Sequence, residues 1–132
     1  MKLHLARAEG RKVFSGYGPG YVAVNGERHE RSLIVLPDRV LDWEVARFDE
    51  LTESALSSLA ALSLEILILG TGARFRLLPA LATRALRNAG TAVEVMDTQA
   101  ACRTYNILLS EDRRVGAAVL VERDSQPPLD PG

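Results

Sequence analysis

The segment LEILILGTGARFRLLPALATRALRNAGTAVEVM, residues 64–96, decides the fold of this chain. It begins with the apolar run LEILILG and ends with AVEVM, and both runs have the length and β-branched content of buried strands. Between them lies PALATRALRNAG, with Pro79 at its start and Gly90 at its end, as is usual around a helix. The pattern predicts a βαβ unit, whose right-handed crossover brings the loops after both strands to one sheet edge.

The sequence on both sides of this unit predicts further strands and helices. In YVAVNGERHERSLIVLP, Asn25 and Gly26 separate two alternating or apolar runs and predict a hairpin, preceded by the turn YGPGY. VLDWEV then predicts a short strand, and FDELTESALSSLAAL predicts a helix that Asp49 could cap. A last helix is expected over residues 98–110, followed by the strand VGAAVLVE. We therefore predict an α/β fold: a three-layer domain around a central mixed β-sheet, with flanking helices and an N-terminal β-hairpin.

Length and composition favour one globular domain. The chain has 132 residues, of which 47% are hydrophobic and 25% are charged, a balance typical of folded proteins. We expect a single domain over residues 1–123 and a disordered tail over residues 124–132, because the tail holds half of the prolines and little apolar surface.

Charge and hydropathy exclude several partner classes. A net charge of -1 provides no overall positive field, so nucleic acid is not expected as a partner without a local basic patch. The apolar run LSLEILILG is too short to cross a bilayer, and the amino terminus lacks the apolar core of a signal peptide. We expect a cytoplasmic protein with no direct membrane insertion.

The two loops at the predicted sheet edge contain polar groups that could bind a ligand. The GTG loop could offer backbone amides, and Thr98 would open a helix with the positive end of its dipole. Arg74, Arg76 or Arg103 could supply charge for an anion. The candidate ligand-binding residues are Gly70, Thr71, Gly72, Asp97, Thr98, Arg103 and Asn106.

The same residues also have a structural interpretation. Glycine is common in tight turns, Asp97 or Thr98 could cap the helix, and the polar outer face of a helix needs no ligand to explain it. GTGARF is not a dinucleotide fingerprint, because Phe75 stands at the third glycine position, and no GK[ST] follows to make a P-loop.

No catalytic residue, metal site or cofactor is predicted. Cys102, the only cysteine, has the same helical phase as Tyr105 and Leu109, which predicts a buried and unreactive thiol. The two histidines, His4 and His29, lack the spacing of metal ligands.

The acidic residues between positions 38 and 53 predict a solvated acidic face rather than a pair of catalytic carboxylates. Trp43, the only tryptophan, lies inside this segment and is expected in the core. Neither feature therefore provides an active site.

LILGTG, the proline-started helix and VEVMDTQAACRTYNILLSEDRRVGAAVL together resemble a known family of small domains of largely unassigned function. Its mitochondrial members include the assembly factor 3 of respiratory complex I. The resemblance covers residues 21–121 and includes VNGERHERSLIVLP and the DW that follows it. It implies three layers around a central mixed sheet, with no recognised cofactor and no established catalytic residues. The lack of a mitochondrial presequence suggests a bacterial-type member.

Three functional hypotheses follow. The resemblance implies a non-enzymatic assembly or protein-interaction module, linked to the biogenesis of a respiratory or other membrane complex. Its partner would be a protein that the sequence does not identify, and homo-oligomers stay open. The alternative is a small-molecule or anion-binding protein, which could be an enzyme, that uses the GTG loop and the DT helix start. A thiol redox protein based on Cys102 is disfavoured by the predicted burial of that residue.

Overall fold

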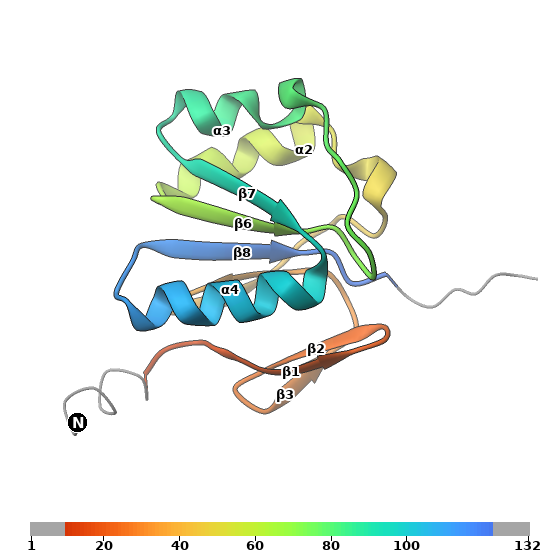
Figure 1. Cartoon of the computed structure of the whole chain (residues 1–132), viewed down its shortest axis with the longest axis vertical. Helices are drawn as coiled ribbons and strands as arrows, with labels where there is room; N and C mark the ends of the chain where they lie inside the picture. Colours follow the sequence, from red (N-terminus) through yellow and green to blue (C-terminus); the bar gives the residue numbers. More distant parts are fainter. Residues whose placement is uncertain (1–9, 123–132) are drawn as a thin grey trace, which may run out of the picture.

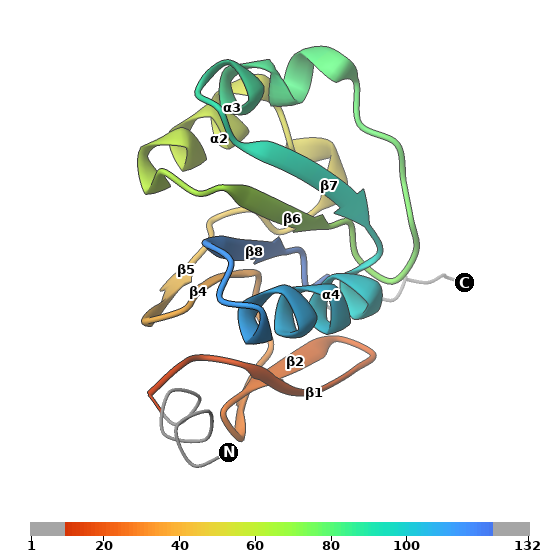
Figure 2. The ribbon, with the colours of Figure 1, turned by 60° about the vertical axis from the view of Figure 1, so that its left-hand side comes forward.

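The computed structural model describes residues 10–122 of the chain. His4 and the expected tail over residues 124–132 lie outside the described residues. The described part consists of a five-stranded sheet, a three-stranded sheet, one longer helix and several short helices (Figures 1 and 2). The predicted α/β class with a central mixed sheet is confirmed.

The five-stranded sheet is the centre of the fold. Its strands are β4 (Leu33–Leu36), β5 (Arg39–Asp42), β6 (Ile66–Gly70), β7 (Ala92–Met96) and β8 (Val115–Val119). They are ordered β5-β4-β8-β6-β7. β6 is parallel to both neighbours, whereas β4 is antiparallel to β5 and β8, so the sheet is mixed.

Both faces of this sheet are covered, which explains the continuous apolar runs in its central strands. On one face, Ile66 and Ile68 belong to a core that includes the long helix α4 (Thr98–Ser110) and the three-stranded sheet. On the other face, Leu67 and Leu69 pack into a second core with the short helices α2 (Glu53–Ser57) and α3 (Arg84–Asn88). Figure 1 shows these layers in order, from α2 and α3 through the sheet and α4 to the small sheet.

The predicted βαβ unit is present, with a shorter helix than the sequence suggested. β6 and β7 pair in parallel, and α3 (Arg84–Asn88) lies between them after the 3-10 turn η3 (Ala80–Thr83). Pro79 precedes this turn with φ -61°, and Gly90 ends the helical region with φ +89°. Both residues therefore have the boundary roles expected of them.

The N-terminal hairpin is confirmed. It is part of a small antiparallel sheet of three strands, β1 (Phe14–Gly18), β2 (Tyr21–Val24) and β3 (Glu27–His29). Asn25 and Gly26 have φ angles of 49° and 87°, as a two-residue hairpin turn requires. The run after this turn is divided between two sheets. β3 is largely exposed. Every residue of β4 is buried, and the strand pairs with β8 in the central sheet, because an apolar run such as LIVL must be covered on both faces.

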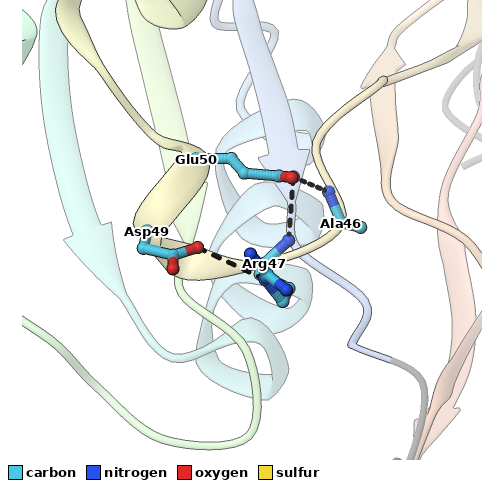
Figure 3. A network of polar contacts seen from close by, with 4 residues as sticks. All are labelled: Ala46, Arg47, Asp49 and Glu50. Carbon is cyan, nitrogen blue, oxygen red and sulfur yellow. Dashed lines mark hydrogen bonds and ion pairs between the residues drawn. The ribbon is translucent and has the colours of Figure 1, made fainter.

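The helix predicted after Arg47 is broken, and Asp49 does not cap it. The segment forms η1 (Phe48–Glu50), α2 (Glu53–Ser57) and η2 (Ser58–Leu62). Thr52 caps α2 instead, since its hydroxyl accepts a hydrogen bond from the Ala55 amide at 3.1 Å. Asp49 forms an exposed ion pair with Arg47, and the Glu50 carboxylate accepts hydrogen bonds from the Ala46 and Arg47 amides (Figure 3). No helix within residues 10–122 is both long and apolar enough to span a bilayer.

Candidate functional site at the sheet edge

The loops after β6 and β7 meet at one edge of the central sheet, as the βαβ pattern predicts. The Thr71 amide donates to the Met96 carbonyl at 2.8 Å, and the Thr98 amide donates to the Gly72 carbonyl at 2.9 Å. Gly70, Thr71, Gly72, Asp97 and Thr98 are therefore brought together (Figure 1 shows the ends of the strands). β8 ends at the same edge, because it runs parallel to β6.

Thr98 connects the three segments at this edge. Its hydroxyl donates to the Leu120 carbonyl at 2.7 Å and accepts from the Gly72 amide at 2.9 Å. The Leu120 amide in turn donates to the Gly70 carbonyl at 2.9 Å. Thr98 is 8% exposed and Leu120 is fully buried, so these bonds lie inside the protein. The Gly72 amide already has an acceptor and is not free to bind an anion.

Close packing explains both glycines of the GTG loop. A Cβ at Gly70 would lie 2.9 Å from the Thr98 hydroxyl and 3.2 Å from the Ala101 Cβ. Gly72 has φ +105°, and a Cβ there would lie 2.7 Å from a carboxylate oxygen of Glu122. Close approach by α4 thus requires glycine at position 70, and the positive φ favours glycine at position 72, without any ligand.

The buried Thr71 side chain shapes the loop that follows. Its hydroxyl donates to the Arg74 carbonyl at 2.7 Å and accepts from the Arg76 amide at 3.2 Å. Asp97 is the N-cap of α4, since its carboxylate accepts from the Ala100 amide at 2.9 Å. Both side chains are engaged in hydrogen bonds that fix the local backbone.

Arg103 and Asn106 face the three-stranded sheet rather than the GTG loop. Arg103 donates to the Tyr17 hydroxyl at 3.0 Å, and its guanidinium lies 5.9 Å from the Tyr17 ring centre. Asn106 accepts from the Phe14 amide at 3.0 Å and donates to the Phe14 carbonyl at 2.8 Å. The two bonds to one backbone residue attach β1 to α4. Sequence reasoning grouped these side chains with the sheet edge, because it could not place the hairpin over α4.

Cys102 is buried, as predicted from its helical phase. It is fully inaccessible beside Tyr105, whose ring meets Phe14 edge to face at a centroid distance of 5.4 Å. Burial raises the pKa of the Cys102 thiol from its ordinary 9.0 to about 12. The thiol is therefore protonated at neutral pH, and it lacks the thiolate character that redox or nucleophilic chemistry needs.

Two hollows lie at this edge of the protein. The smaller, of about 160 Å³, separates the GTG loop and the start of α4 from the turn between β1 and β2. The larger is a groove of about 850 Å³ between residues 30–32, residues 42–47 and Arg76. Val121 and Glu122 line both hollows. The groove has the volume of a typical ligand site.

Sequence reasoning missed the groove. Trp43 is 8% exposed and belongs to the core, as predicted. It also lines the groove, together with charged residues that precede and follow it in the sequence. The Arg76 guanidinium lies 5.2 Å from the Phe48 ring centre, and its buried Nε has no hydrogen-bond partner among the described residues. The charged lining mixes both signs, and residues 10–122 contain no cluster of His, Cys, Asp and Glu suited to a metal ion.

Comparisons with known proteins place this architecture among relatives. A family model described as a protein of unknown function (DUF498/DUF598) matches residues 14–120. Assembly factor 3 of NADH dehydrogenase [ubiquinone] 1 alpha subcomplex from Bos taurus is 41% identical over 103 residues, which cover 76% of this chain and 55% of the bovine protein. An uncharacterized protein from Rhodobacter capsulatus is 39% identical over 111 residues, covering 84% and 86% of the two chains.

A solved structure has the same fold. The crystal structure of a Bordetella parapertussis protein superposes with a TM-score of 0.81 and 42% sequence identity, covering 86% of this chain and 98% of that one. The chain spans only 55% of the length of the bovine assembly factor.

Proposed function

The chain belongs to the DUF498/DUF598 family, and we propose that it is a non-enzymatic assembly factor, a protein-interaction module that helps a multi-subunit membrane complex to form. The observation that carries this proposal is the 41% identity to assembly factor 3 over 103 residues. Relatives with that name in other vertebrates are also 36–39% identical. The finer proposal is that the complex is a respiratory NADH dehydrogenase.

The chemistry of the sheet edge disfavours the alternative, a ligand-binding function. Ligands of open α/β sheets often bind at this edge through free backbone amides. Here the Gly72 amide is bonded to Thr98, and the Asp97 carboxylate is bonded to the first turn of α4. A ligand that used these groups would have to displace hydrogen bonds that connect β6, α4 and the end of β8.

The remaining candidate residues support the same proposal. Arg103 and Asn106 hold the three-stranded sheet against α4, which is a structural task. The alternative function, binding of a small molecule or anion at the GTG loop, would therefore use the small hollow beside Gln99 and Glu122 rather than the seven residues together. A carboxylate in that hollow opposes an anion.

The proposal is tested by capture from the cells that naturally make the chain. A tagged chain is purified from mild-detergent extracts, and the proteins retained are quantified by mass spectrometry against the tag alone. We expect several subunits of one membrane complex to be enriched together. Enrichment of no such subunit, combined with a stoichiometric small molecule retained in native mass spectrometry, would favour the alternative.

A further inference from the structure

The connection between β6 and α3, residues 71–83, differs in charge from the rest of the protein. The sequence from Thr71 to Val93 contains four arginines and no aspartate or glutamate, although the whole chain has a net charge of -1. Among the described residues, only Arg84 of these arginines lies within 4.0 Å of a carboxylate, in an exposed pair with Glu53 at 3.5 Å. This segment therefore carries a local excess of positive charge.

Exposed apolar side chains lie in the same connection. Large hydrophobic residues that are exposed in the described part of the chain are few, and three of the four belong to this segment: Phe75 at 50%, Leu77 at 79% and Leu81 at 52%. Figures 1 and 2 show the segment, in green, running along the outside of the molecule from the end of β6 towards α3. Apolar residues gathered in this way between arginines are typical of an interaction surface.

Three backbone amides of the connection are also unpaired. The amides of Phe75, Leu77 and Leu78 have no hydrogen-bond partner within residues 10–122, and the segment belongs to no helix or strand until Ala80. Its start is nevertheless held in place, because the Thr71 hydroxyl binds both the Arg74 carbonyl and the Arg76 amide. The connection thus offers free backbone donors on a fixed support.

We infer that residues 73–81 form a docking segment for an acidic, extended stretch of a partner protein. The partner backbone pairs with the amides of Phe75 and Leu77, its apolar side chains cover Leu77 and Leu81, and its carboxylates face Arg74. This inference rests on the proposed function. It specifies which surface of the assembly factor binds the partner protein, and which kind of partner segment that surface recognises.

A protein partner fits this surface better than an anionic membrane does. A membrane-surface helix satisfies its own backbone hydrogen bonds, whereas the docking segment is irregular and would carry its unpaired amides towards lipid. A partner strand satisfies those amides directly. Arginine and aromatic side chains together are also the residues that most often dominate protein–protein affinity.

The test uses photo-crosslinking of the full chain in the cells that naturally make it. The photoreactive residue benzoylphenylalanine replaces Leu77 or, as the matched control, Ile107, an apolar residue of α4 that is 58% exposed. We expect crosslinks from position 77 to an acidic peptide of one subunit of the captured complex, at about tenfold or more the yield from position 107. Arg74→Glu should lower that yield by roughly 30-fold or more, a loss typical of a hot-spot residue, and Arg74→Lys should largely preserve it.

Each contrary outcome has a distinct meaning. Equal yields from positions 77 and 107, or a crosslinked peptide without acidic residues, would overturn the docking inference. Leu77-dependent sedimentation with vesicles of phosphatidylglycerol and phosphatidylethanolamine would replace the protein partner with a membrane. The wild-type chain and variants of Leu77 and Arg74 are also compared in the capture experiment, using variants whose thermal unfolding is unchanged. If all of them capture the complex equally well, only the docking inference fails. If the wild-type chain captures no complex, the proposed function fails too.

Discussion

Replacing Thr98 with valine keeps the shape of the side chain but removes both hydrogen bonds of its hydroxyl. The variant leaves the Gly72 amide and the Leu120 carbonyl without partners, at a site where Leu120 is fully buried. Each buried polar group left unsatisfied costs about 1–3 kcal/mol, so the two groups together should lower the free energy of unfolding by about 2–6 kcal/mol. For a domain of this size the melting temperature should fall by roughly 8–24 °C.

The assay is urea and thermal denaturation followed by circular dichroism. Thr98→Ser is the matched control, because it keeps the hydroxyl and should lose no more than about 1 kcal/mol. A valine variant that is as stable as the serine variant would refute the structural interpretation of the GTG loop and the DT helix start. That result would favour a ligand that binds to the Thr98 hydroxyl.

Three further predictions concern packing and burial. Asn106→Ala should destabilise the protein by about 1–3 kcal/mol, because two backbone groups of Phe14 lose their partners, and hydrogen exchange should accelerate at the Phe14 amide. Gly70→Ala should cost about 1–3 kcal/mol in urea unfolding, because its Cβ would lie 3.0 Å from a Cα atom of α4, whereas Gly16→Ala has space for its Cβ and serves as the control. Native Cys102 should react with thiol reagents only as fast as the protein opens. Because burial raises the pKa of its thiol from 9.0 to about 12, unfolding releases a proton above pH 9, and stability should fall between pH 9 and 12 more steeply than in Cys102→Ala.

Local sequence signals predicted the parts of the fold that depend on local physics. The Asn25-Gly26 turn needs two positive φ angles, and α4 begins directly after the capping residue Asp97, so both were visible as short motifs. The burial of Cys102 followed from helical periodicity alone. In contrast, the apolar content of residues 48–62 suggested one helix, and only the structure reveals the break at Leu51, whose φ and ψ of -83° and 71° are not helical.

The candidate site was predicted in its location but not in its contacts. Parallel strands and a right-handed crossover are sufficient to place the GTG loop beside Thr98. Which polar groups are free to bind a ligand depends on residues that are distant in the sequence. The Leu120 carbonyl accepts a hydrogen bond from the Thr98 hydroxyl, and the Phe14 carbonyl accepts one from the Asn106 amide group. The groove beside Trp43 was invisible for the same reason, since its walls come from four separate parts of the chain.

The central claim, that the chain acts as an assembly factor, is tested most directly by deleting its gene and following the respiratory NADH dehydrogenase on native gels after a pulse of labelled amino acids. We predict that the deletion strain accumulates subassemblies and forms the complete complex more slowly, and that the wild-type chain and Thr98→Ser restore normal assembly. Unchanged assembly kinetics of this and every other membrane complex in the deletion strain would contradict the account.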